Sequence, residues 1–198
     1  MRKIVVVSNL TLDGVMQAPG GPEEDVRDGF EHGGWAGPYN DPVKGRIMAQ
    51  GMAQGSELLF GRRTYQHFFK VWPGRTDNPF SPVLDNTMKY VASRTLTEPL
   101  PWKNSTLLEG DAGKAVAALK RQPGKDLVIL GSGELVRALM RRNLIEEFQL
   151  LIHPLVLGTG RRLFGDDGTL ARFELASSVP TTTGVVIATY RLLQGRTG

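Results

Sequence analysis

The sequence predicts an α/β fold: a three-layer α/β/α domain around a central mixed, mostly parallel sheet with an antiparallel C-terminal edge. Over the first two-thirds of the chain, short apolar runs alternate with segments of helical periodicity, which is typical of right-handed crossovers and a parallel sheet. The last strand-like runs follow one another directly, which indicates an antiparallel edge. The chain of 198 residues has no internal repeat or linker, so we expect residues 1–198 to form a single domain.

The N-terminal elements follow from local patterns. Residues 4–7 are continuous and β-branched, as in a strand buried on both faces. Residues 17–40 are rich in Gly, Pro and acidic residues and predict a long loop, whose aromatic side chains either cover a ligand or pin the loop to the core. Asp41-Pro42 is an N-cap followed by proline at the first helical position, so a helix should begin there.

The remaining elements continue the alternation. We expect strands at residues 57–60, 89–92, 106–108, 127–130, 148–152, 172–176 and 185–193. Helices should follow the glycine that ends the 57–60 strand, span residues 111–121, and begin after Gly131-Ser132-Gly133. Residues 72–86, with several prolines, predict an irregular connection.

Composition excludes several classes of function. The chain has no cysteine, which excludes disulfides, thiol nucleophiles and iron–sulfur clusters and fits a reducing cytosol. No stretch reaches the roughly 18 apolar residues of a membrane span, and the N-terminal apolar run is too short for a signal peptide. The net charge of +4 is spread along the chain, which disfavours nucleic acid as a partner. We therefore expect a cytoplasmic protein that binds neither membranes nor nucleic acid.

The stretch at residues 126–142 suggests a phosphate site. The apolar run that ends at Leu130 passes through Gly131-Ser132-Gly133 into a helix, so free backbone N–H groups and the positive end of the helix dipole point at one place. A plain strand-to-helix turn explains the same glycines. The usual dinucleotide fingerprint is not matched, because Val136 stands where its last glycine belongs.

Two other strand ends carry related chemistry. Gly61-Arg62-Arg63-Thr64 offers a glycine, guanidinium groups and a hydroxyl, and Ser93-Arg94 offers a hydroxyl and a guanidinium. In open α/β sheets, ligands bind outside the carboxyl ends of the strands. Arg pairs with phosphate through two hydrogen bonds, so a single ligand with several phosphates would use all three strand ends (residues 61–64, 93–94 and 131–133).

Other catalytic chemistry is sparse. The three histidines are isolated, and we expect no metal site. The acidic residues near the strand ends are Asp13, Asp25, Asp41 and Glu134, and of these Asp13 and Glu134 are the candidate catalytic acids. Each has a structural alternative, since Asp41 suits a helix cap, Asp13 suits a turn and Glu134 suits the first turn of a helix. A demanding reaction such as hydride transfer would then require a bound cofactor, for example a nicotinamide.

Five motifs resemble those of the dihydrofolate reductase superfamily, and more closely the C-terminal reductase domain of the bifunctional riboflavin-biosynthesis deaminase–reductase. The resemblance covers nearly the whole chain. It is carried, in order, by Ser8-Asn9-Leu10-Thr11-Leu12-Asp13-Gly14, Phe60-Gly61-Arg62-Arg63-Thr64-Tyr65, Val91-Ala92-Ser93-Arg94, Gly131-Ser132-Gly133-Glu134-Leu135, and Pro154 to Gly160 followed by Leu163-Phe164.

The resemblance implies an NADPH-dependent reductase, commonly a homodimer, that acts on a small heterocycle of the 5-amino-6-(5-phosphoribosylamino)uracil or pterin type. It implies cofactor binding by Gly61, Arg62, Thr64, Ser93, Arg94 and by Gly131, Ser132, Gly133, Glu134 and Leu135. It places Leu12, Asp13, Met16, Gly158, Thr159 and Gly160 near the nicotinamide and substrate.

The chain departs from these families in two places. Dihydrofolate reductases carry a carboxylate in the helix that reads Asp41-Pro42-Val43-Lys44-Gly45-Arg46 here, where only the N-cap is acidic. The zinc deaminase half of the bifunctional enzyme needs cysteines that are absent. The alternatives are therefore a stand-alone reductase with this or another substrate, a nucleotide-binding module without turnover, and a weaker third idea, RNA binding by the basic surface.

Overall fold

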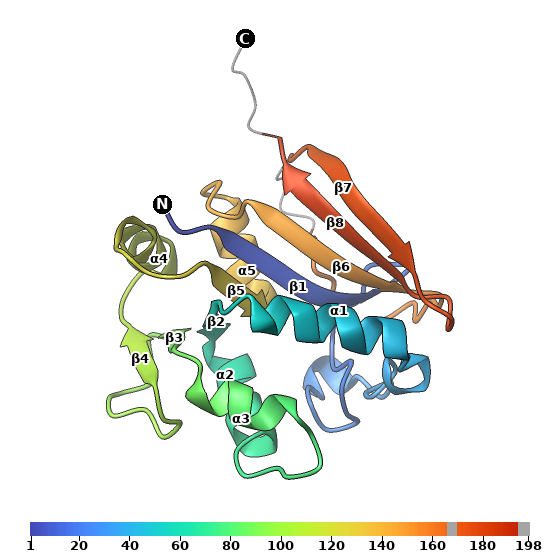
Figure 1. Ribbon diagram of the computed structural model, residues 1–198, viewed down its shortest axis with the longest axis horizontal. Helices are drawn as coiled ribbons and strands as arrows, with labels where there is room; N and C mark the ends of the chain where they lie inside the picture. The colour runs from blue at the N-terminus through green and yellow to red at the C-terminus, as the bar shows by residue number, and fades with distance from the viewer. Residues whose placement is uncertain (166–169, 194–198) are drawn as a thin grey trace.

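The computed structural model describes residues 1–165 and 170–193, and in this part of the chain eight strands form one sheet (Figure 1). The strand order is β4-β3-β2-β5-β1-β6-β8-β7. The strands are β1 (Ile4–Thr11), β2 (Glu57–Gly61), β3 (Lys89–Ala92), β4 (Ser105–Leu108), β5 (Leu127–Leu130), β6 (Glu147–His153), β7 (Phe173–Pro180) and β8 (Val186–Leu192).

The pairing confirms the predicted mixed sheet. Every pair from β4 to β6 is parallel, whereas β8 pairs antiparallel with β6 and with β7. β1 is the central strand and runs parallel between β5 and β6. β1 continues beyond the predicted residue 7 because β6 extends beside it as far as the pair Thr11–His153.

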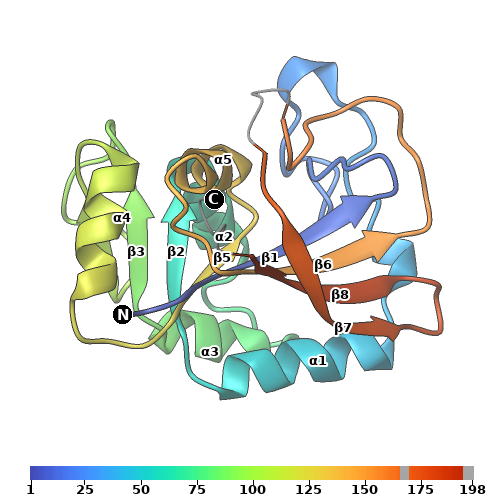
Figure 2. The ribbon, with the colours of Figure 1, turned by 90° about the horizontal axis from the view of Figure 1, so that it is seen from above.

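Helices cover both faces of the sheet, so the predicted three layers are confirmed (Figure 2). One face, with Ile4 and Val6 of β1, is packed under α4 (Ala112–Arg121) and α5 (Gly133–Met140). The opposite face carries α2 (Arg62–Val71) and α3 (Phe80–Asn86) against Leu58 and Phe60 of β2. α1 (Pro42–Ala53) lies along this second face as well, beside β1 and β6.

Helix α3 was not predicted, because it lies inside the proline-rich connection of residues 72–86. Its prolines, Pro79 and Pro82, stand at the N-cap and in the first turn, where a missing N–H breaks no helical hydrogen bond. Asn78 accepts the N–H of Phe80 (2.9 Å), and Leu84 is buried against β2 and β3. The composition of this segment indicates a loop, but the burial of one short apolar face against the sheet makes part of it helical.

The long loop of residues 17–40 is pinned to the protein by its aromatic side chains. Phe30 and Trp35 are buried together with Val15, and the indole N–H of Trp35 donates to the carbonyl of Gln17 at 2.7 Å. Tyr39 packs edge-on against the buried ring of His153. Of the two roles open for these aromatics, the structure supports the packing role.

Helix α1 is attached by polar contacts at its N-terminus and by apolar side chains along its length. As predicted, Asp41 is the N-cap, and its carboxylate accepts the N–H groups of Val43 (2.6 Å) and Lys44 (3.1 Å). The same carboxylate accepts the N–H (2.7 Å) and hydroxyl of Thr182 in the β7–β8 turn. No residue of the helix is fully buried, although Ile47 and Met48 pack partly buried against the core, and the cap adds a polar attachment to the β7–β8 turn.

The hydrogen bonds to Asp41, above all that from the hydroxyl of Thr182, lower its pKa to about 2. Because the pKa in the folded state lies below the unfolded value, Asp41 stabilises the fold above about pH 4, and this stabilisation is lost as the pH falls towards 2. We expect the urea unfolding free energy of the wild type to fall more steeply over this range than that of Asp41→Asn, which cannot titrate. Parallel pH profiles of the two proteins would contradict this assignment.

Candidate functional site

A cleft of about 1170 Å³ lies between α1 and the sheet. Its floor is the face of β1 with Val7 and Asn9, together with Gln149 of β6, and its roof includes Lys44 and Met48 of α1. The cleft runs towards the carboxyl ends of the parallel strands, where α2, the first turn of α5 and residues 23–27 of the long loop line it. This position is where open α/β sheets bind their ligands.

The three strand ends predicted from the sequence are neighbours. β3, β2 and β5 are adjacent and parallel, so residues 93–94, 61–64 and 131–133 emerge at the same edge of the sheet. The N–H of Gly61 donates to Oγ of Ser132 (3.0 Å), and the N–H of Ser132 donates to Oγ1 of Thr64 (3.1 Å). The β2 and β5 ends therefore form one hydrogen-bonded unit at the mouth of the cleft.

Two hydroxyl groups predicted to face a ligand are already engaged as acceptors. Oγ of Ser132 accepts from Gly61, and Oγ of Ser93 accepts the N–H groups of Thr95 (3.1 Å) and Leu96 (3.0 Å). Ser132 also has a left-handed backbone (φ 54°), which is uncommon for a residue other than glycine and turns the chain sharply into α5. The hydroxyl groups of these two serines thus hold the turns after β3 and β5, and the assignment of both residues to cofactor binding stays a prediction.

The groups that remain available at this edge suit an anion. The first turn of α5 has backbone N–H groups with no carbonyl acceptor inside the helix, those of Gly133, Glu134 and Leu135. The guanidinium of Arg62 donates to Thr95 (2.8 Å), which brings it beside the β3 end. Arg94 is exposed there and makes no hydrogen bond or ion pair with any residue in the described ranges.

Gly133 lies in close contact with the side chain of Met16. A Cβ at this position would lie 2.5 Å from the sulfur of Met16, so the helix start and the segment after β1 approach each other closely. Met16 and Gly133 both line the cleft. The structure thus brings the predicted substrate residue Met16 next to the predicted cofactor turn.

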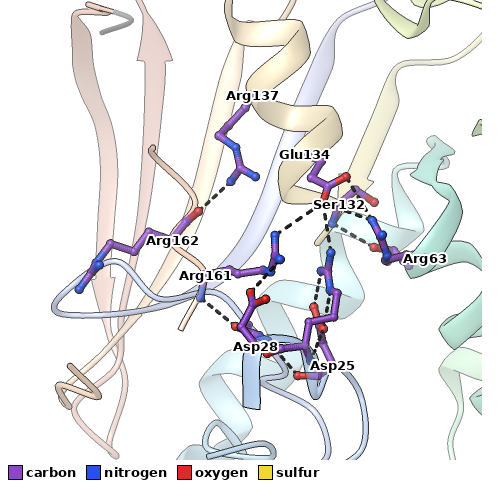
Figure 3. Close-up of polar contacts among 11 residues, drawn as sticks. Asp25, Asp28, Arg63, Ser132, Glu134, Arg137, Arg161 and Arg162 are labelled. Carbon is purple, nitrogen blue, oxygen red and sulfur yellow. Dashed lines mark hydrogen bonds and ion pairs between the residues drawn. The ribbon is translucent and has the colours of Figure 1, made fainter. Parts of the chain in front are cut away.

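Glu134 is surrounded by three arginines that come from three different segments (Figure 3). Its carboxylate lies 3.1 Å from Arg27 of the long loop, 3.2 Å from Arg63 of α2 and 3.7 Å from Arg161. Arg27 also pairs with Asp25, and Arg161 pairs with Asp28. Glu134 therefore tethers the long loop across the mouth of the cleft, and its predicted catalytic role stays untested.

We expect Glu134→Gln to raise the affinity for inorganic pyrophosphate about 3-fold to 30-fold at low salt, because it removes a negative charge beside the α5 N-terminus and releases three guanidinium groups. Amide hydrogen exchange of residues 23–28 should become faster in this variant. Glu174→Gln, on the exposed face of β7, removes the same charge far from the cleft and serves as the control. Weaker pyrophosphate binding by Glu134→Gln would contradict the tether.

Asp13 holds the glycine loop, residues 155–160. Its carboxylate accepts the hydroxyl of Thr11 (2.5 Å) and the N–H groups of Gly158 (2.9 Å) and Leu157 (3.3 Å). These hydrogen bonds, led by that of Thr11, lower the pKa of Asp13, which keeps the group ionised at neutral pH. An ionised carboxylate with these partners is suited to fixing a loop, and its assignment as a catalytic acid stays a prediction.

The other predicted substrate residues lie on or beside this loop. Leu12 is 64% exposed, and its N–H donates to Leu155. Gly158 and Thr159 are exposed, whereas Gly160 packs against Phe30 and Val15. None of Leu12, Asp13, Gly158, Thr159 and Gly160 lines the cleft, so Met16 is the one predicted substrate residue that does so among the described residues.

Sequence reasoning missed several polar residues that line the cleft. They are Asn9, Glu24, Lys44, His67 and Gln149. Burial raises the pKa of Glu24, although the N–H of Gly20 donates to its carboxylate at 2.6 Å. No motif marks these residues, because they come from five separate segments that only the folded chain brings together. Period-2 alternation on β1 could have flagged Asn9 as facing the same side as Val5 and Val7.

Among the described residues, no group of three or more His, Asp or Glu side chains is arranged to hold a metal ion. No helix in residues 1–165 and 170–193 is long and apolar enough to cross a membrane.

One family model and two curated relatives match most of the chain. Residues 2–187 match the family model described as the RibD C-terminal domain. The chain is 28% identical over 196 residues to the uncharacterised protein YyaP of Bacillus subtilis, covering 96% of this chain and 94% of that protein. It is 29% identical over 163 residues to the uncharacterised protein YwjB of the same organism, covering 82% and 83%.

Solved structures share the fold. A putative riboflavin biosynthesis protein from a Shewanella species superposes with a TM-score of 0.69 at 19% identity, covering 97% of this chain and 99% of that one. A pyrimidine reductase-like protein from Corynebacterium diphtheriae superposes with a TM-score of 0.68 at 14% identity, covering 98% and 93%. Since the family model spans nearly the whole chain, the protein belongs to the RibD C-terminal domain family.

Proposed function

We propose that the protein is a reductase that transfers a hydride from NADPH to a small heterocyclic substrate. A substrate of the 5-amino-6-(5-phosphoribosylamino)uracil type, or a pterin-like one, fits the family best. The observation that carries the proposal is that three strand ends predicted to bind an anion lie side by side, and that two of them, the ends of β2 and β5, line the mouth of one large cleft. Such an arrangement suits a ligand with several phosphates at the mouth and a reactive ring inside.

The residues at the mouth fit the phosphates of NADPH. The first-turn N–H groups of α5 would hold the pyrophosphate, because a helix N-terminus favours negative charge. Arg62 and Arg94 would hold the 2′-phosphate at the β3 end, where guanidinium groups form paired hydrogen bonds with phosphate oxygens. Gly61 and Thr64 fix the turn between these two places through their hydrogen bonds with Ser132.

The bound nicotinamide would supply the hydride, and the protein would bind and orient the reactants. Val7 and Leu151 on the floor and Met48 on the roof give the cleft apolar walls that exclude water from the ring. The tethered loop with Asp25 and Arg27 closes part of the mouth. These features would position a substrate ring inside the cleft.

Titration of the protein with NADPH and NADH tests this proposal. We expect NADPH to bind at micromolar concentration and more tightly than NADH, and its absorbance at 340 nm to fall when an aminouracil or dihydropterin substrate is added. No binding of either dinucleotide at millimolar concentration, or a preference for NADH, would reject it.

The second candidate is a nucleotide-binding module with no turnover. It is favoured by the positions of the two predicted acids, since Asp13 and Glu134 are both engaged in holding loops. Cofactor binding without oxidation across a panel of aminouracils, pterins and simple carbonyl compounds would support this alternative.

We also propose that the protein is a homodimer. β7 is an edge strand of the described sheet, seven of its eight residues are exposed, and Leu175 and Val179 present apolar side chains there. Exposed edges of this kind are usually covered, because their free N–H and C=O groups invite pairing. Sedimentation equilibrium should give twice the chain mass of 21.7 kDa for the wild type. It should give a larger monomer fraction for Leu175→Lys.

A further inference from the structure

Lys44 of α1 is a charged residue that lines the cleft and has no side-chain partner among the described residues. The ammonium of Lys44 makes no hydrogen bond or ion pair with any residue of the described ranges, although burial lowers its pKa. An ammonium group that loses water on burial needs hydrogen-bond acceptors to replace it. The charged or titratable groups acting on it are Asp41 at the cap of its own helix and the buried His153 of β6.

The floor of the cleft contains an unpartnered acceptor. The side-chain oxygen of Asn9 is buried and has no hydrogen-bond partner. Asn9 lines the cleft from β1, two residues beyond Val7 on the same face. A buried amide oxygen without a donor is costly, so a ligand with an N–H group at this place would be favoured.

The fold places these two groups at the same end of the cleft. Ile47 and Met48 of α1 pack in one apolar cluster with Val7 and Leu151, and Leu151 is the registered neighbour of Asn9. α1 begins beside the β7–β8 turn, next to the carboxyl end of β6, so Lys44 lies one turn closer to the strand ends than Met48. The electrostatic effect of Lys44 on His153 agrees with this position.

We propose that Lys44 and Asn9 together recognise the edge of a cyclic amide, with its carbonyl oxygen at the ammonium of Lys44 and its ring N–H at the side-chain oxygen of Asn9. A simple anion fits less well, because the Asn9 oxygen would repel it. The apolar walls formed by Val7, Leu151 and Met48 suit a flat ring. This inference concerns the substrate end of the same cleft and rests on the proposed function for its biological meaning.

Binding without turnover tests the proposal. The probes are 6-aminouracil, which has the amide edge, and 1,3-dimethyl-6-aminouracil, which lacks both ring N–H groups, each titrated by ligand-observed NMR with and without NADPH. We expect the wild type to prefer 6-aminouracil at least 10-fold. Asn9→Leu should reduce this preference to less than 3-fold. Lys44→Met should instead weaken the binding of both probes, because both carry the carbonyl oxygen that the ammonium group would contact. Lys114→Met, on the exposed side of α4, should retain it.

The possible outcomes separate this inference from the proposed reaction. Equal affinity of the wild type for the two uracils would overturn it. So would an unchanged preference in Asn9→Leu, or unchanged affinity for both probes in Lys44→Met, when the circular dichroism spectrum of the variant matches the wild type. Tighter binding of inorganic phosphate than of 6-aminouracil at Lys44 would also overturn it. A preserved preference with no oxidation of NADPH would reject the reductase and still support the recognition pair.

Discussion

Replacement of Arg94 by alanine is expected to weaken NADPH binding by about 1.5–3 kcal/mol and to leave NADH binding almost unchanged. Arg94 is exposed at the end of β3 and has no partner within the described chain, so its guanidinium is free for a ligand. The 2′-phosphate is the group that distinguishes the two dinucleotides. A residue that pairs only with this phosphate must therefore affect one dinucleotide and not the other.

The measurement is a pair of equilibrium titrations, followed by quenching of protein fluorescence, at fixed ionic strength. Arg46→Ala is the matched control, because Arg46 is an exposed arginine of α1 and its loss changes the net charge equally. If both dinucleotides lose the same affinity in Arg94→Ala, the arginine does not hold the 2′-phosphate. If Arg46→Ala has the same effect, the loss reflects general electrostatic attraction rather than a contact.

Most of the helices and strands could be predicted from the sequence, because a short local pattern is enough to specify each of them. The β-branched run at residues 4–7, the cap at Asp41 and the apolar run ending at Leu130 each specify one element. Because β2, β3 and β5 are adjacent and run parallel, their carboxyl ends lie together, and this brings Gly61, Ser93 and Gly131 close to one another.

The details of the site depend on contacts that no local pattern contains. Whether Oγ of Ser132 faces a ligand or Gly61 depends on the left-handed backbone of Ser132 and on the separation of two strands. The three arginines around Glu134 come from positions 27, 63 and 161, and nothing in their local sequences indicates that they meet. Composition can show that cationic groups are present, but only the folded chain shows which are already neutralised.

Replacement of Gly160 by alanine is expected to lower the free energy of unfolding by about 2–4 kcal/mol, through backbone strain and overpacking together. Gly160 has a φ of +109°, and a Cβ there would lie 2.6 Å from the ring of Phe30 and 2.8 Å from Val15. Both neighbours belong to the buried cluster that pins the long loop beside the cleft. The added methyl group would push this cluster apart.

Gly158→Ala supplies the matched comparison. Gly158 is in the same glycine loop and also has a positive φ (+72°), but a Cβ there would meet nothing within 4 Å. It should therefore cost about 1 kcal/mol of strain alone. Urea unfolding of the two variants separates the effects, and equal losses would show that packing against Phe30 contributes nothing. A clearly larger loss of unfolding free energy in Gly160→Ala would mean that this glycine is needed because the loop packs closely on the protein's own core. The glycine would then be explained without any contact to a substrate.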